Sequence, residues 1–468
     1  MPSVKHNGGG HIAVDMEKLV SSYKSDQSKE SKGFCLSRES CIFKIPSILS
    51  RHNPKAYSPN AFSFGPWHHD DDHLQLTHAL KINYLKDLLH RFPDPEAKLS
   101  QLEAAVTKME VEARQCYAEQ ISSDDKGKFV RILLLDGCFI IELFRKYDKV
   151  INPDPDDEMM SPDPDDPIFG MACMLQFLYH DLILLENQIP WFVLKRIFDL
   201  TKESIKQSAD IELHQLAIQF FGNIFTSDGP LEHKHLDTDK IKHIIDLLRE
   251  YLFLPYLANT CKASCRQQNS ICCFPFFWLS SPQKTTDKEH KHLPSASRLT
   301  EAGIKFKRSP CNKGIFTIRF CEGVLEVPSI LIHNTTETMF RNLIAYEQCY
   351  YHLEPIVTSY AKLMDNLIDK VDDLHILCKR GIISNSLSSE DATQFFNKLY
   401  NDARIIPQSY YSEIYKEVNS YYRQGWPRWR AAYTQNYFTK PWAIVSQLFA
   451  LMILTLTLLQ VVPAFLLK

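Results

Sequence analysis

FVRILLLDGCFIIELFRKY, residues 129–147, is apolar on nearly every side when it is wound into a helix. A surface helix shows one apolar stripe, whereas a helix that is apolar all round is buried. Arg131, Asp136 and Glu142 lie within this segment, and each charge in the middle of a membrane span costs about 2.5–3.5 kcal/mol. The segment is therefore predicted to be the central helix of a folded core and not a membrane span.

The sequence on either side of this segment also has a mainly helical pattern. Apolar residues recur at three- and four-residue spacing, which is typical of helices with one buried face. Lys313–Pro328 differs, because Ile315, Thr317 and Arg319 alternate with Phe316, Ile318 and Phe320 as in a strand. The chain then turns at Cys321-Glu322-Gly323, and this pattern predicts a β hairpin. The fold class is thus predicted as mainly α: a large helical cytosolic domain with a small β hairpin, plus one C-terminal transmembrane helix. The further helices are predicted over residues 77–91, 99–120, 168–187, 191–200, 338–379, 393–401 and 410–432.

The composition is that of a folded protein without a nucleic-acid partner. Of the 468 residues, 44% are hydrophobic and 23% are charged, close to the average of globular proteins. The formal net charge is −3, so the basic footprint of a DNA- or RNA-binding protein is missing. The N-terminus lacks the apolar run of a secretory signal, and the 13 cysteines, an odd number, suit reduced thiols in the cytosol.

The chain divides into a tail, a helical domain and a terminal apolar segment. Residues 1–33 are polar and rich in glycine, which predicts a mobile tail. The helical domain is assigned to residues 34–435, with irregular insertions at about 148–167 and 257–292. The first insertion contains the unit Pro-Asp-Pro-Asp-Asp twice, and its prolines and repelling charges predict an exposed acidic loop.

The terminal apolar segment, residues 441–467, contains no charged residue. A helix that crosses about 30 Å of hydrocarbon needs roughly 20 residues. Trp442–Val462 supplies that length before Pro463 interrupts it. This stretch is therefore predicted to be a transmembrane helix, which makes a membrane the first predicted partner.

The residues before the span predict its orientation. Arg423, Arg428, Arg430 and Lys440 lie there, and residues 421–440 include no acidic residue. Positive charge stays on the cytoplasmic side of a membrane. The predicted localisation is a single-pass protein of the plasma membrane or an endomembrane, anchored by its C-terminus with its N-terminal domain in the cytosol. The alternative is a soluble protein in which the last helix belongs to the core.

A series of short phrases runs along the whole chain. The phrases are CIFKIP (41–46), FGPWHH (64–69), LDGCFIIEL (135–143), DLILLENQIP (181–190), PSA (294–296), EAGIKF (301–306), RNLIAYE (341–347), GII (381–383), and YF with PW (437–438, 441–442). In this order and spacing they resemble the plant domain-of-unknown-function 247 family, over roughly residues 41–465. The doubled acidic unit departs from the family pattern, in a region where the family varies.

The resemblance implies a plant protein with a C-terminal membrane span. The family has no established enzymatic activity, so no catalytic, cofactor-binding or metal-binding residue is carried over to this chain. Some grass members are associated with self-incompatibility loci, which suggests a recognition role for those members.

His68-His69-Asp70-Asp71-Asp72-His73 is one candidate metal site, because imidazole and carboxylate groups bind zinc and other divalent cations. Adjacent residues seldom converge on one ion, and no spaced partner such as His-Glu-x-x-His accompanies them. The favoured interpretation is a solvated loop before the helix that begins at Thr77.

Cys261, Cys265, Cys272 and Cys273 form the densest group of thiols. Four thiolates can close a structural zinc site, but the usual pair of Cys-x2-Cys knuckles is missing. Lipidation of Cys272 or Cys273, which lie beside an aromatic run, is a second interpretation. Free cysteines in a variable loop are the third and favoured one.

Asp136, Glu142, Asp181 and Glu186 lie inside very apolar segments. Buried carboxyl groups have raised pKa values and can act as general acids or bases. Six residues separate the first pair and five the second, so neither pair shares one face of a helix. A catalytic pair would have to form between helices, and the favoured alternative is a structural role. The partners expected for that role are helix ends and Arg131, Arg145 or Arg341.

Three functions follow from these patterns. The leading one is a membrane-tethered protein of unknown biochemical activity, a non-catalytic interaction or recognition component with an unknown protein partner. The second is a membrane-associated enzyme that uses the buried carboxylates, and the third is the soluble protein described above. The sequence has no Gly-x-Ser-x-Gly, no phosphate-binding loop and no dinucleotide fingerprint, so catalysis is left open and not predicted.

Overall fold

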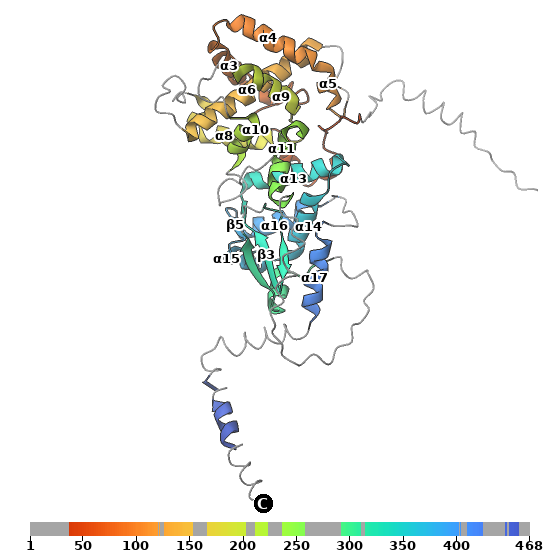
Figure 1. Cartoon of the computed structure of the whole chain (residues 1–468), viewed down its shortest axis with the longest axis vertical. Coiled ribbons are helices and arrows are strands. Elements are labelled where there is room, and N and C mark those ends of the chain that lie inside the picture. Colours follow the sequence, from red (N-terminus) through yellow and green to blue (C-terminus); the bar gives the residue numbers. More distant parts are fainter. Residues whose placement is uncertain are drawn as a thin grey trace, which may run out of the picture.

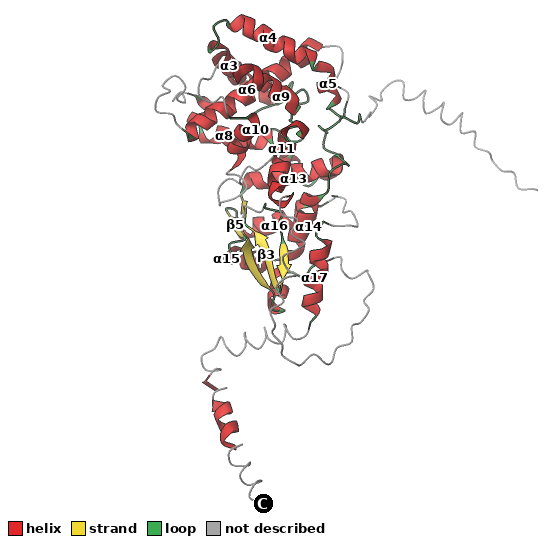
Figure 2. Cartoon of the chain, in the orientation of Figure 1, coloured by secondary structure: helices red, strands yellow, loops and turns green. Residues whose placement is uncertain are grey.

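The chain folds into an all-helical part followed by a part with helices and two small sheets (Figures 1 and 2). The buried apolar side chains of both parts form one contiguous cluster. The computed structural model describes residues 37–119, 121, 126–152, 166–202, 211–222, 236–257, 292–309, 314–401, 403, 410–424, 445–446 and 449–457.

Helix α6 (Lys126–Ile151) is the centre of the all-helical part. Between Phe129 and Tyr147 its side chains are buried on nearly all sides. The prediction of a central helix over residues 129–147 is therefore confirmed. The helices packed around α6 are α3 (His78–His90), α4 (Pro95–Lys108), α9 (Trp191–Thr201) and α10 (Leu213–Phe221).

Two predicted helices of this part are each split in two. The first breaks at Met109, where φ and ψ are −96° and 0°. A continuous apolar stripe cannot reveal such a break, because the stripe resumes in the next helix. The resulting elements are α4 and α5 (Glu110–Gln115), and likewise α7 (Pro167–Gly170) and α8 (Ala172–Leu182). The shorter elements are α2 (Ser47–Ser50), η1 (Pro54–Ala56), η2 (Asp72–Thr77) and η6 (Thr238–Lys240).

Strand β3 (Val324–Pro328) is the middle strand of a three-stranded sheet. Strand β2 (Arg319–Cys321) pairs with it in antiparallel fashion, and β1 (Lys305–Ser309) pairs with it in parallel. Glu322 and Gly323 form the hairpin turn with φ of 49° and 80°, a left-handed pair that favours glycine. The predicted hairpin is confirmed in its turn and second strand.

The first strand of the hairpin is shorter than predicted. Residues 315–318 are not a strand, because their side chains are all buried and do not alternate between two faces. Phe316 instead stacks on Phe253, with ring centroids 4.9 Å apart, and packs edge-on against Tyr360 at 5.1 Å. Burial in an aromatic cluster thus replaces strand pairing at these residues.

The second sheet joins β4 (Ile330–Ile332) to β5 (Ile383–Asn385) in parallel. The range 338–379, predicted as helical, contains three helices. The helices of this part are α12 (Ala296–Glu301), α13 (Asn334–Cys349), α14 (Ile356–Leu367), α15 (Val371–Lys379), α16 (Ser389–Leu399) and α17 (Ser412–Arg423).

Helices α11 (Ile244–Leu257) and α13 join the two parts of the chain. Tyr346 on α13 donates a hydrogen bond of 3.0 Å to Asp246 on α11. Arg249 on α11 donates one of 2.8 Å to the backbone carbonyl of Glu354. These polar contacts tie the end of the all-helical part to the helices beside the sheets.

The predicted transmembrane helix over Trp442–Val462 is wrong. Over the described ranges, no helix combines the length and the apolar composition that a membrane span requires. Within 441–467, helix is described at residues 445–446 and 449–457, and the longer piece rises only about 14 Å against about 30 Å of hydrocarbon. The single-pass, C-terminally anchored localisation depended on that span and is wrong as well. The described side chains of this segment do not join the core either, since Phe449 is 60% exposed.

Several predictions concern residues outside the described ranges. They are the tail at residues 1–33, most of the acidic loop (153–165) and nearly all of the second insertion (258–291), which contains Cys261, Cys265, Cys272 and Cys273.

Candidate functional site

Three of the four carboxylates that the sequence singles out surround one irregular segment, residues 60–69. Asp181 lies at the end of α8, Glu186 follows it, and Asp136 lies on α6. These three groups and their partners form a buried polar network that holds the 60–69 segment against the helices.

Asp181 binds the backbone at the start of the 60–69 segment. Its side chain is fully buried, and its oxygens accept the N–H groups of Asn60, Ala61 and Phe62 at 2.7, 2.8 and 2.7 Å. The neighbouring His180 places Nδ1 2.8 Å from the same carboxylate. Both oxygens are therefore occupied by groups that a substrate would have to displace.

Asp136 binds a lysine and the middle of the same segment. Lys81 on α3 places Nζ 2.6 Å from Asp136 Oδ1, and Gly65 donates its N–H to Oδ2 at 2.9 Å. The ammonium group of Lys81 also donates to the carbonyl of Ser63. Lys81 thus links the helix carboxylate to the backbone of the 60–69 segment.

Gly65 is the one residue of this segment with a left-handed backbone, at φ +76°. A Cβ atom there would lie 2.8 Å from the carbonyl oxygen of Gln188, which is too close for any side chain. Beside it, Asn187 accepts the Phe64 N–H at 2.6 Å and donates to the Phe62 carbonyl at 2.9 Å. The segment therefore needs glycine at position 65 and an amide at position 187.

Glu186 contacts Ile45, which precedes the 60–69 segment, and His68, which lies near the end of that segment. Its Oε1 accepts the Ile45 N–H at 2.6 Å, and its Oε2 lies 3.4 Å from His68 Nε2. His68 Nδ1 lies 2.9 Å from Asp71. Burial alone would lower the pKa of His68, but the Glu186 and Asp71 carboxylates outweigh burial and raise that pKa.

Glu142 lies further along α6 and has an arginine as its partner. The Arg91 guanidinium contacts its carboxylate, and the Glu142 side chain is 2% exposed. Arg145, one turn further along α6, is also buried and donates to Thr201 Oγ1 at 2.9 Å. Glu142 is therefore surrounded by cations and is not open to solvent.

All four carboxylates make contacts that hold the fold together. Asp136, Glu142 and Asp181 are almost completely buried, and all four groups are bound by backbone N–H groups or basic side chains. Asp136, Glu142 and Asp181 have almost no solvent access, whereas the Glu186 side chain is 17% exposed and binds the Ile45 N–H through Oε1.

Of the arginines predicted as partners, Arg145 is a charged neighbour of Glu142, and the hydrogen bonds described for all three arginines go to other groups. Arg131 donates to the carbonyl of Gly127, Arg145 to Thr201 and Arg341 to Glu337. Lys81 was not predicted as a partner, although its spacing from Tyr84 and Leu88 places it on the buried face of α3. A lysine on an apolar stripe is the signal that could have identified it.

In the His68–His73 stretch, a candidate metal site in the sequence, His68 and His69 contact other protein side chains. His68 is the histidine that bridges Asp71 and Glu186, and the His69 ring packs edge-on against His78 with centroids 5.8 Å apart. In the part of the chain that the structure describes, no group of three or more His, Cys, Asp or Glu side chains is placed to hold a metal ion. The stretch is only partly solvated, since His68 is held in the polar network.

An exposed apolar face lies on α7 and α8. Residues 167–179 include no charged residue, yet Met171 and Phe177 are 46% and 37% exposed and Cys173 is also exposed. On α8 only Leu178, Asp181 and Leu182 are buried. Exposed apolar surface of this kind on a helix is typical of protein interaction sites.

Comparisons with known proteins give one consistent result. The family model described as "Plant protein of unknown function" matches residues 42–456. The UPF0481 protein At3g47200 of Arabidopsis thaliana is 29% identical over 427 residues, which cover 90% of this chain and 85% of that protein. The putative UPF0481 protein At3g02645 of the same plant is 24% identical over 504 residues, with 90% and 89% covered. No solved structure matches the chain significantly.

Proposed function

We propose that this chain, which belongs to the plant domain-of-unknown-function 247 family, is a non-catalytic component that recognises another protein. The observation that carries this proposal is the exposed apolar face of α7 and α8, residues 167–177, with Met171 and Phe177 at its surface. Methionine and aromatic side chains on an exposed helix adapt to and bury the apolar surface of a partner. A role in self-incompatibility, suggested for some grass members, is a narrower form of the same proposal.

The contacts of the buried carboxylates support recognition over catalysis. An enzyme that used Asp136, Glu142, Asp181 or Glu186 would need one of them to reach a substrate. Each of them instead holds backbone or a basic side chain. These contacts support the recognition proposal over the enzyme alternative.

The test compares three forms of the full chain fused to a proximity-labelling enzyme in plant cells. They are the wild type, the double variant Met171→Ser/Phe177→Ser and the control Leu76→Ser, which changes a residue that is 87% exposed on another element. We expect one set of proteins to be labelled by the wild type and the control but not by the double variant.

Binding with purified proteins completes the test. A partner found in this way should bind the wild type and Leu76→Ser at least about tenfold more tightly than the double variant, which is about 1.4 kcal/mol. Circular dichroism must show that all three chains are equally folded. If the labelled proteins are the same for all three forms, the α7–α8 face is not a recognition surface.

A further inference from the structure

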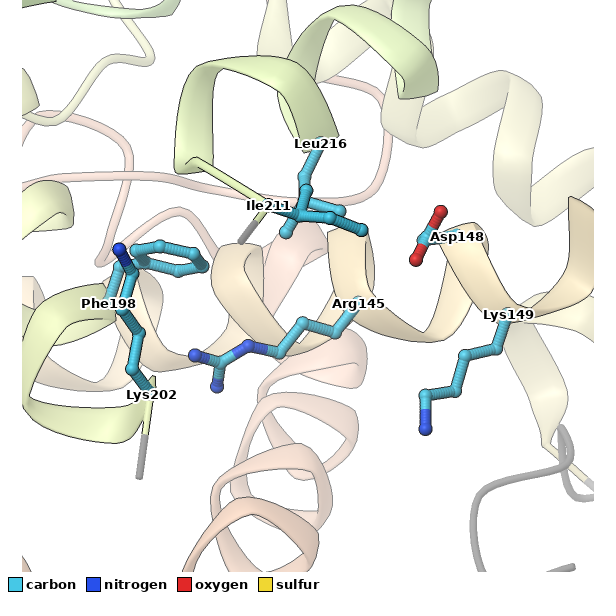
Figure 3. Close-up of a pocket in the computed structure, with 7 residues that line it drawn as sticks. All are labelled: Arg145, Asp148, Lys149, Phe198, Lys202, Ile211 and Leu216. Atoms are coloured by element: carbon cyan, nitrogen blue, oxygen red, sulfur yellow. The ribbon is translucent and has the colours of Figure 1, made fainter. Parts of the chain in front are cut away.

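A recess lies between the C-terminal half of α6, the end of α9 and the start of α10 (Figure 3). Arg145 forms part of its wall, and its side chain runs between the elements toward Phe198 and Lys202. The residues that line the recess are Arg145, Asp148, Lys149, Phe198, Lys202, Ile211 and Leu216.

Arg145, which lines this recess, has one guanidinium nitrogen without a hydrogen-bond partner among the described residues. Arg145 is only 4% exposed. Its Nη2 donates a hydrogen bond of 2.9 Å to Thr201, and its guanidinium carbon lies 5.0 Å from the centre of the Phe198 ring. Nη1 is buried and has no hydrogen-bond partner among the described residues. A buried donor without a partner is costly, so a ligand atom that accepts from Nη1 would be favoured.

The charges around Arg145 do not balance. Arg91 and Arg145 share Glu142 as their acidic neighbour, so two positive charges and one negative charge leave a formal charge of +1. Burial lowers the pKa of Arg145 to about 10, with Glu142 opposing the shift, and the group stays charged at pH 7. A buried charge without a full partner is destabilising, and a bound anion would correct this.

The rest of the recess suits an anion with an apolar body. Lys202 lies at the edge, where it pairs with Glu212 at 3.0 Å, and Lys149 adds a second ammonium group to the lining. The carboxylate of Asp148 accepts from Asn152 at 2.9 Å. Phe198, Ile211 and Leu216 supply the apolar surface.

We propose that this recess binds a small organic phosphate or carboxylate, whose oxyanion accepts a hydrogen bond from Arg145 Nη1 and whose apolar part lies against Phe198 and Ile211. Arginine is well suited to oxyanions because its charged N–H groups make short, strong hydrogen bonds. This site is separate from the α7–α8 face, so the proposal goes beyond protein recognition.

The test measures the thermal unfolding midpoint of the full chain at constant ionic strength. Phenyl phosphate, benzoate and inorganic phosphate are the probes, with chloride as the reference. The variants are Arg145→Met, which removes the charge at similar length, and Lys240→Gln, which removes an exposed charge outside the recess. We expect phenyl phosphate and benzoate to raise the midpoint of the wild type and Lys240→Gln and to leave Arg145→Met unchanged.

A second variant covers the case in which Arg145→Met does not fold. Ile211→Phe fills the recess while keeping Arg145, and it should weaken phenyl phosphate binding at least about tenfold in isothermal titration calorimetry. Inorganic phosphate should bind more weakly than phenyl phosphate, since it lacks the apolar part. No response of the wild type, equal responses of wild type and Arg145→Met, or unweakened binding to Ile211→Phe would each overturn the proposal.

Discussion

The Lys81 ammonium nitrogen lies 2.6 Å from Asp136 Oδ1, and the two side chains are only 1% and 2% exposed. Such a pair is expensive to form in a protein interior, and the removal of one partner leaves a bare buried charge. The pair joins α3 to α6 beneath the 60–69 segment, which both residues also bind.

Lys81→Met should lower the free energy of unfolding by about 3–5 kcal/mol, because Asp136 then keeps its charge without a cation. The double variant Lys81→Met/Asp136→Asn should lose clearly less than the sum of the single changes, since the amide oxygen still accepts from Gly65. Urea denaturation followed by circular dichroism measures both. Lys128→Met, in the exposed pair with Asp70, is the control and should cost less than about 1 kcal/mol. Equal losses for Lys81→Met and Lys128→Met would contradict the structural role of the pair.

Asp181→Ala should release the start of the 60–69 segment. Three N–H groups lose their acceptor, and the buried one, of Phe62, costs about 1–3 kcal/mol by itself, so a loss of at least that size is expected. The free energy of unfolding of Asp181→Asn should lie between those of Asp181→Ala and the wild type, because one acceptor oxygen remains. Hydrogen exchange read by mass spectrometry should be faster at residues 60–62 in both variants. Asp239→Asn, with a side chain that is 82% exposed, is the control, and unchanged exchange at residues 60–62 would contradict the assigned contacts.

His243 should make the fold sensitive to acid. It is completely buried, with Nε2 3.0 Å from the carbonyl of Cys41, and burial lowers its pKa from 6.5 to about 3. Between these values the unfolded chain binds a proton that the folded chain does not. The free energy of unfolding therefore decreases as the pH falls from about 6.5 to about 3, by up to about 1.4 kcal/mol per pH unit from this residue.

The slope of the free energy of unfolding against pH, measured between pH 4 and 6, tests this prediction for His243. His243→Gln should be less stable at pH 7 but should show a smaller slope than the wild type. His90→Gln changes an exposed histidine and should keep the wild-type slope. A His243→Gln slope equal to that of the wild type would mean that His243 is not kept neutral by the fold.

Gly137→Ala should weaken the packing of α6 against α9. The new Cβ would lie 2.6 Å from Ile197 Cδ1 and 3.6 Å from Leu194 Cδ2. The clash, at about 1–3 kcal/mol, should exceed the gain in helix propensity of about 1 kcal/mol. Ile197→Val removes the clashing carbon. The double variant should therefore lose less free energy of unfolding than the sum of the two single losses, as measured by thermal or urea unfolding. A more stable Gly137→Ala chain would show that α9 moves freely.

Local patterns predicted the helices well and the strands only in part. Residues 129–147 form the central helix, because a segment that is apolar all round can only be buried. The turn at Glu322-Gly323 was also recognisable, since its residue types suit a left-handed backbone. Strand β1 was missed because its parallel partner β3 lies across a turn and another strand, and no local alternation reports such a pairing.

The candidate site was predicted in its residues but not in its contacts. Asp136, Glu142, Asp181 and Glu186 were identified as buried carboxylates, and the structure places all four against polar partners. The partners themselves come from α3, Arg91 and the 45–68 region, between 51 and 141 residues away in the chain. The C-terminal segment shows the converse error, since an uncharged run of sufficient length was taken for a membrane span that the described helix does not form.

The sequence by itself determined which faces of the helices are apolar, where the hairpin turns and which polar groups must be buried, because these depend on residue type and spacing along one element. The tertiary structure alone decided which distant group meets each buried charge and which apolar face is left uncovered. That difference has one physical cause: a buried charge or an apolar face can be satisfied by any suitable partner, and packing between remote segments selects one of them.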